Sequence, residues 1–321
     1  MNFVDIVGIF EILKLKNYIQ VILHFCKDMW KVVSVTLMML ISIIFCSYIE
    51  WTHITSNVYA QDYTNNNNSS LYQLANNGTL AKILSGNLIN YLNESASILQ
   101  ITSMMPEVSN IQYADKIDSI LHGISDSDDV EKRQIADKIL KYVDTFEAIT
   151  YLLPNGDMYM EEPYDRQLGQ GRDNFAFRDY YQGAVNTKQA FLGDVIVSSS
   201  TGDKVALISV PIYLKEDSSF LGIWSGVLNL VKFNNMLRAL SLPDDIRVVF
   251  VDGNGQKVAD SNSLLSNKSE SFVDLNSFKS GKSGKSGNVS EVIDGTKFLS
   301  SYAPVSVLSK TWIVIVMMQS G

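Results

Sequence analysis

The densest polar and aromatic cluster of the chain is residues 177–181, with the sequence FRDYY. A guanidinium such as that of Arg178 can make two parallel hydrogen bonds to a carboxylate, and neighbouring tyrosine rings exclude water and strengthen those bonds. The cluster is therefore typical of a site for a small carboxylate. The alternative is a structural role, in which Arg178 stacks on the rings and pairs with Asp173 or Asp179.

Catalytic residue sets are sparse in this sequence. After residue 50 the only histidines are His53 and His122, which argues against a serine–histidine triad and against a histidine metal site. Both cysteines, Cys26 and Cys46, precede residue 50, so the remainder has neither a disulfide nor a cysteine metal site. Four acidic residues beside a predicted hairpin could supply paired carboxylates, but their position favours a solvated edge. They are Asp157, Glu161, Glu162 and Asp165. We therefore expect no enzymatic activity and no cofactor.

An uncharged apolar run of 18 residues, 32–49, precedes the rest of the chain. This is about the shortest helix that spans a bilayer. Lys27 and Lys31 precede the run, which predicts a cytoplasmic N-terminus and a single-pass membrane protein with its C-terminal part outside the cell. The alternative is a signal peptide cleaved near Ala60, which would give a secreted protein. Translation could also begin at Met29. Both alternatives export the remainder.

The segment after the run predicts a polar linker followed by three helices. Residues 61–70 are rich in asparagine and lack apolar periodicity. From residue 71 to about 105, an apolar face at helical spacing predicts one long stalk helix, which could pair with a second copy to form a homodimer. This face consists of Leu80, Ile83, Leu84, Leu88, Leu92, Ile98 and Leu99. Shorter helices are predicted at about 117–124 and from 126–129 onward.

From residue 146 the pattern changes to strands joined by tight turns. Residues 154–157 and 252–255 have the sequences PNGD and DGNG, which favour hairpins. The predicted strands are 146–153, 158–160, 194–198, 205–213, 220–230, 247–251, 256–260, 289–293, 297–304 and 312–318, with a short helix at 231–240. Helices followed by two hairpin-rich antiparallel sheets predict an α+β fold.

The acidic net charge of the chain argues against one class of partner, the nucleic acids. The net charge is −8 and the sequence pI is about 4.9. Nucleic-acid binding needs a basic surface, so we do not expect a nucleic acid as partner.

These elements, in this order, resemble the extracytoplasmic double Cache (dCache) sensor domains of chemoreceptors and histidine kinases. The resemblance covers about residues 65–318. It depends on RDYY at 178–181, SSTG at 199–202, VPIY at 210–213 and a last strand that begins with Trp312. It implies two PAS-like sheet domains, of which the membrane-distal one binds the ligand. The predicted organisation is a leader at 1–31, a membrane helix or signal sequence at 32–49, a linker at 61–70, a stalk and distal domain at 71–240, and a proximal domain at 241–321.

The resemblance also implies site residues. Arg178 matches the arginine that binds the ligand carboxylate in the amino-acid-binding members, and Tyr180 stands where they have tryptophan. Their tyrosine and first aspartate fall on Ile196 and Ser198, and the aspartate that binds the ammonium falls on Asn229. Without carboxylates an ammonium would lack partners, which favours a carboxylate without an amine, or a small polar compound. The predicted ligand site is Arg178, Tyr180, Tyr181, Asp173, Ile196, Ser198 and Asn229.

The sequence thus predicts a sensory module that binds a small organic ligand outside the cell. The chain ends at Gly321 with no output domain, so signalling would need a separate partner. The alternatives are a surface structural or adhesion protein without a ligand, and the input domain of a truncated kinase or chemoreceptor.

Overall fold

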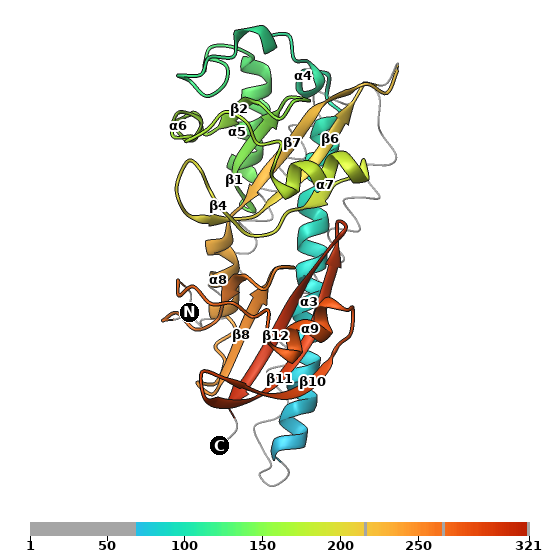
Figure 1. Ribbon diagram of the computed structural model, residues 1–321, viewed down its shortest axis with the longest axis vertical. Coiled ribbons are helices and arrows are strands. Elements are labelled where there is room, and N and C mark those ends of the chain that lie inside the picture. The colour runs from blue at the N-terminus through green and yellow to red at the C-terminus, as the bar shows by residue number, and fades with distance from the viewer. Residues whose placement is uncertain (1–68, 215–216, 265–266, 320–321) are drawn as a thin grey trace, which may run out of the picture. The chain divides into compact units, whose positions relative to one another are not determined.

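The computed structural model describes residues 69–214, 217–264 and 267–319, which belong to one compact unit (Figure 1). The predicted leader and membrane helix, and residues 61–68 of the predicted linker, lie outside the described residues. None of the helices formed by the described residues combines the length and the apolar character needed to cross a bilayer.

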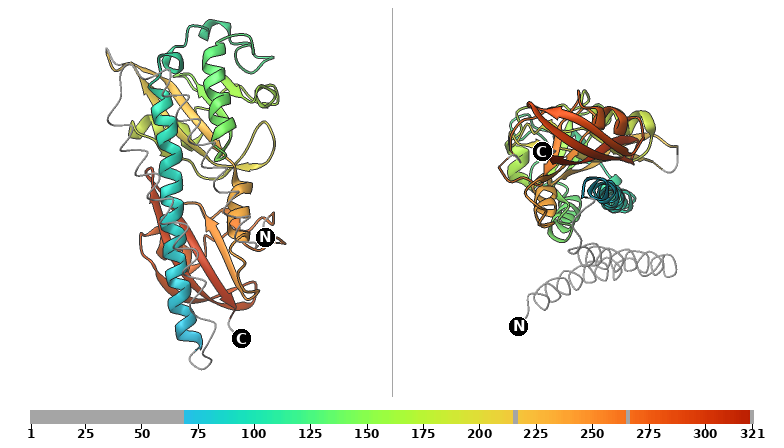
Figure 2. Two further views of the ribbon diagram at one scale, coloured as in Figure 1. Left: turned by 180° about the vertical axis from the view of Figure 1, so that it is seen from behind. Right: turned by 90° about the horizontal axis from the view of Figure 1, so that it is seen from below.

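The first element is the 35-residue helix α3 (Ser69–Ser103), which covers most of the segment predicted as a long helix. It packs along strands of both sheets, as Figure 2 shows from behind. Leu84, Leu88, Leu92 and Leu99 are buried against these sheets. The leucine face that was considered for a homodimer is therefore occupied within the chain itself. A role for α3 as a stalk stays a prediction.

The first sheet has the strand order β2-β1-β7-β6-β3, with every pair antiparallel. Its strands are β1 (Phe146–Leu152), β2 (Met158–Glu162), β3 (Phe191–Leu192), β6 (Leu207–Tyr213) and β7 (Phe220–Leu228). Successive side chains of a strand point to opposite faces of the sheet, and both faces of this sheet are covered and buried. Ile149 and Tyr151 pack with the leucines of α3, whereas Ala148 and Leu152 face Phe175 and the helix that follows it.

Short helices and a two-stranded ribbon surround this sheet. They are α4 (Pro106–Ser109), α5 (Val130–Tyr142), α6 (Tyr164–Leu168), α7 (Asp179–Thr187) and the 3-10 turn η1 (Ala114–Lys116). Helix α8 (Leu230–Arg238) follows β7 and packs on β9 (Lys257–Asp260) of the second sheet. The ribbon is formed by β4 (Ile196–Val197) and β5 (Lys204–Val205). Figure 1 shows α7 beside β6 on the face of the sheet opposite to α3.

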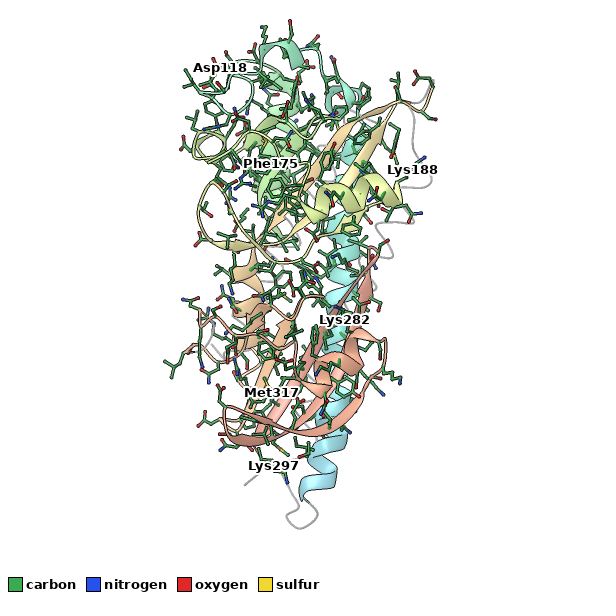
Figure 3. All side chains as sticks on the ribbon, in the orientation of Figure 1. Asp118, Phe175, Lys188, Lys282, Lys297 and Met317 are labelled. Atoms are coloured by element: carbon green, nitrogen blue, oxygen red, sulfur yellow. The ribbon has the colours of Figure 1, made fainter. Side chains whose placement is uncertain are left out.

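The second sheet has the order β10-β11-β12-β8-β9, again entirely antiparallel. Its elements are β8 (Ile246–Val251), β9 (Lys257–Asp260), α9 (Asn276–Lys282), β10 (Gly287–Ile293), β11 (Thr296–Val307) and β12 (Lys310–Gln319). Phe278 of α9 packs on one face with Val249 and Ile313, while Val314 and Val316 face the cluster that contains α3. In Figure 3, Lys282, Met317 and Lys297 lie with this sheet and Phe175 with the first.

The predicted α+β fold with antiparallel sheets is confirmed, and nearly every predicted strand is present within a few residues. The predicted boundary near residue 241 falls between α8 and β8. Its status as a domain boundary stays a prediction, because residues 69–321 group as one compact unit.

Two predicted elements are wrong. Residues 117–124 form no helix: the Asp118 carboxylate accepts the N–H of Ile120 at 2.7 Å, and the backbones of Asp118 and Gly123 bond to each other. Local hydrogen bonds of this kind compete with a helix, and they leave the Ile120 side chain 81% exposed. The strand predicted at 194–198 is reduced to the two residues of β4.

A buried lysine lies between α5 and the first sheet. The Lys132 ammonium is 2.5 Å from the Asp129 carboxylate and 4.4 Å from the centre of the Tyr159 ring, and the side chain is fully buried. Burial lowers the pKa of Lys132 from 10.5 to about 8, although Asp129 opposes the shift. A protonated lysine is therefore costly in the folded state at neutral pH.

We expect the free energy of unfolding to rise by about 2 kcal/mol between pH 7.5 and pH 9.5. In this window the folded protein has released the Lys132 proton while the unfolded chain, with an ordinary lysine pKa, still holds it, so alkali favours folding. Above pH 10 stability should fall again, because burial raises the pKa of Tyr159 and only the unfolded chain then ionises. Urea unfolding across this range measures the effect. Exposed Lys82→Met should keep the rise and Lys132→Met should lose it; a rise that persists in Lys132→Met would contradict the assignment.

Candidate functional site

A small cavity lies on the face of the first sheet opposite to α3. Its volume is about 30 Å³, which is room for one or two water molecules. Its wall comes from the sheet, from the segment around α6 and α7, and from the ribbon β4–β5. The lining residues are Thr150, Met158, Glu161, Arg166, Gln170, Phe175, Arg178, Tyr180, Ile196, Ser198, Ser199, Val205, Leu207 and Val227.

Arg178, the residue just before α7, lines the cavity. An extended backbone there, with φ of −72° and ψ of 143°, turns the chain into the helix. Its Nη2 donates to the carbonyl of Val197 at 3.3 Å, and the guanidinium stacks 5.0 Å from the centre of the Phe177 ring. Its Nε is buried and has no hydrogen-bond partner among the described residues. Since an unmet buried donor costs about 1–3 kcal/mol, this nitrogen is suited to a ligand oxygen.

The two tyrosines that follow have different positions. Tyr180 is 4% exposed and lines the cavity. Burial raises its pKa, Arg178 opposes the shift, and Glu161 and Asp179 add to it, so the phenol stays neutral and can donate a hydrogen bond. Tyr181 is outside the cavity lining: its hydroxyl donates to the carbonyl of Pro154 at 2.6 Å. It does not line the cavity with Tyr180, because consecutive helical residues point in different directions.

The ribbon β4–β5 covers one side of the cavity. Ile196, Ser198 and Ser199 line it from this ribbon, as predicted for the first two. The Ser198 hydroxyl accepts the backbone N–H groups of Ser200 and Thr201, both at 3.3 Å, which stabilises the turn. The ribbon is attached to the body of the site by Arg178 and by a hydrogen bond from the Ser199 hydroxyl to Gln170.

Two further predicted residues do not line the cavity. Asp173 has a side chain that is 46% exposed and lies 2.5 Å from Nδ1 of His122. The side chain of Asn229 accepts the N–H of Lys232 at 3.3 Å and so caps α8. Asn229 follows the end of β7, and the residue that β7 contributes to the cavity lining is Val227.

The cavity wall also contains a polar group, centred on Glu161, that was not expected from the sequence. Glu161 is only 1% exposed, and it accepts hydrogen bonds from Arg166 Nε at 3.2 Å and from Gln170. Burial raises the pKa of Glu161, while Gln170 and Arg166 oppose the shift. Arg166 also contacts Glu147 at 2.9 Å.

The prediction of a solvated edge is therefore wrong for Glu161, and it is wrong for Glu162, which is 7% exposed. All five residues of β2 are buried because the segment after the strand folds back over it. The available signal was the sequence YDRQLGQ at 164–170, which places polar partners directly after the strand.

Comparisons with known proteins agree with this arrangement. A family model described as Cache domain matches residues 62–320. No curated protein matches the chain closely enough to count as a relative.

Several solved structures share the fold. The ligand-binding domain of the Pseudomonas fluorescens chemoreceptor CtaA, in complex with L-isoleucine, has a TM-score of 0.52 at 16% identity, over 76% of this chain and 90% of that one. That of Pseudomonas aeruginosa PctC with GABA has a TM-score of 0.51 at 17% identity, over 75% and 97%. That of Campylobacter jejuni Tlp3 with 4-methylisoleucine has a TM-score of 0.51 at 16% identity, over 78% and 93%. At these identities the likeness shows the fold alone.

Proposed function

The chain belongs to the Cache domain family, as its motifs predicted, and on this basis we propose that it is an extracytoplasmic sensor that binds a small carboxylate in the cavity of the first sheet. Cache sensor domains are ligand-binding receptor domains rather than enzymes. The observation that carries the proposal is the buried Nε of Arg178, which lies in the cavity wall without a partner among the described residues.

The charges of the wall favour an anion. The charged lining residues are Arg166, Arg178 and Glu161. Arg166 is shared between Glu161 and Glu147, so the charge of Arg178 is left for a ligand. A guanidinium binds a carboxylate through two parallel hydrogen bonds, which are strong when water is excluded.

Glu161 changes the expectation about amines. A carboxylate can accept about four hydrogen bonds, and Glu161 receives one on each oxygen from the residues around it. It can thus accept a further bond from a hydroxyl or an ammonium group. An amine was disfavoured because the site was expected to hold no carboxylate that could pair with an ammonium, and Glu161 removes that reason. The ligands of the CtaA, PctC and Tlp3 structures carry both groups, so the test panel should include both kinds of carboxylate.

We expect Arg178→Ala to weaken binding of any carboxylate that the protein binds by at least about tenfold, since hydrogen bonds to charged groups contribute about 1.5–3 kcal/mol. Thermal-shift and calorimetric titrations with acetate, 4-aminobutyrate and L-isoleucine provide the measurement. Arg238→Ala is the matched control, because Arg238 is exposed on α8, outside the cavity lining. Equal affinity of Arg178→Ala and wild type for a bound carboxylate would refute this role.

We also propose the predicted setting: an anchor at 32–49 with the sensor outside the cell, or release after cleavage near Ala60, and signalling through a separate partner. The N-terminal sequence of the mature protein distinguishes the first two. A start at Met1 or Met29 supports the anchor, and a start at Gln61 supports secretion.

A further inference from the structure

A lysine of the second sheet reaches the ligand side of the first. Lys310 is the first residue of β12. Its ammonium lies 3.2 Å from the Asp179 carboxylate, forms a close ion pair with Asp194, and sits 5.3 Å from the centre of the Phe191 ring. Next to it, the N–H of Leu192 donates to the carbonyl of Leu308 at 3.2 Å. The turn between β11 and β12 therefore contacts residues 192–194, which lead into the ribbon, through a backbone hydrogen bond and an ion pair.

The partner Asp179 is the first residue of α7 and lies between two cavity residues, Arg178 and Tyr180. Its Oδ2 accepts the backbone N–H of Asp194 at 2.9 Å as well as the lysine. A single carboxylate oxygen thus connects the start of α7, the segment before β4 and the second sheet. Tyr180 of α7 lines the cavity, and the segment leads into β4, whose Ile196 lines it as well.

The charge balance at this point depends on Lys310. Asp194 is 5% exposed, and close by Asp252 is fully buried, with its carboxylate accepting the N–H of Val195 at 2.8 Å. Burial raises the pKa of Asp252, and Asp194 adds to the shift. Without the lysine, Asp179 and Asp194 would be two adjacent carboxylates without a cation. Their repulsion would be relieved by moving the start of α7 away from residue 194.

We propose that Lys310 is a positioning residue for the ligand site: by neutralising Asp179 and Asp194 it fixes the start of α7, and with it Arg178 and Tyr180. The second sheet is then part of the binding apparatus of the first. A displacement of α7 on ligand binding would pass directly to β12 through the same ion pair. The ligand read-out of this inference rests on the proposed function, whereas its structural read-out does not.

The test compares Lys310→Met, Lys310→Arg and the control Lys232→Met by NMR titration of the full-length protein with acetate and with 4-aminobutyrate. Lys232 also forms an ion pair, with Asp144, but that carboxylate is 61% exposed. We expect Lys310→Met to weaken binding about tenfold or more, Lys310→Arg to restore it to within about threefold, and Lys232→Met to leave it unchanged. A folded Lys310→Met variant that binds a probe as wild type does would overturn the inference.

Hydrogen exchange without ligand separates this inference from the proposed function. The reporters are the amides of Asp194, which donates to Asp179, and of Gln182, which donates to the carbonyl of Arg178. If wild type binds neither probe, the proposed function fails for them, and the inference is decided by these amides. Loss of their protection in Lys310→Met with recovery in Lys310→Arg supports it, and unchanged protection overturns it. Should Lys310→Met not fold, Lys310→Gln removes the same positive charge and keeps a polar side chain, and the same outcomes are read on it.

Discussion

Replacement of Trp224 by alanine is expected to lower the free energy of unfolding by about 3–5 kcal/mol. Trp224 is fully buried in β7, the strand that pairs with both β1 and β6. Its indole N–H donates to the hydroxyl of Thr102 on α3 at 3.0 Å, and its ring lies 6.3 Å from that of Tyr151. The substitution therefore removes a large core side chain and the hydrogen bond that joins the long helix to the centre of the sheet.

Urea unfolding followed by circular dichroism measures this loss. Trp224→Phe is the matched control: it keeps most of the buried ring and loses the hydrogen bond, so it should lose only about 1–2 kcal/mol. A loss below 1 kcal/mol for Trp224→Ala would show that the packing of α3 on the first sheet contributes little to stability.

The strands could be predicted because their apolar runs are bounded by strong turn signals. The PNGD and DGNG turns fix the hairpins β1–β2 and β8–β9. In the first turn the Asn155 side chain accepts the N–H of Asp157 at 3.0 Å, and in the second the Asp252 carboxylate accepts the N–H of Asn254 at 2.9 Å. The helix expected at 117–124 failed for a local reason. Isoleucines at helical spacing are present, but the Asp118 carboxylate accepts the N–H of Ile120, and this hydrogen bond forms a turn instead of a helix.

Of the residues predicted for the ligand site, those that share a local motif are the easiest to place together from the sequence. Arg178 and Tyr180 are two positions apart, and both line the cavity. Glu161 was missed because its burial depends on a segment that folds back over β2, and the only sequence signal was the polar run YDRQLGQ at 164–170. Lys310 was beyond reach for a stronger reason: it approaches Asp179 only when two sheets built from distant parts of the chain pack together.

Arg166→Met is expected to lower the free energy of unfolding at pH 7 by about 3–5 kcal/mol, because it removes the cation beside a buried carboxylate. Arg166 contacts Glu161 at 3.2 Å and Glu147 at 2.9 Å. Burial already raises the pKa of Glu161, and loss of the arginine would raise it further. The folded variant then binds a proton that the unfolded chain binds only near pH 4.5, so its deficit should shrink as the pH falls toward 4.5 and grow as the pH rises through the higher folded pKa.

Urea unfolding of wild type and variant at pH 5 and pH 7 gives the deficit at both values. Arg238→Met, which removes an exposed arginine of α8, should be nearly neutral at both. Adding Glu161→Leu to Arg166→Met should recover much of the loss, because the carboxylate that lacks a partner is then absent as well. A deficit that is the same at both pH values would mean that Glu161 does not take up the proton. In that case Glu161 would stay ionised in the cavity wall without Arg166. The Arg166–Glu161 ion pair would then not be the interaction that stabilises the buried carboxylate.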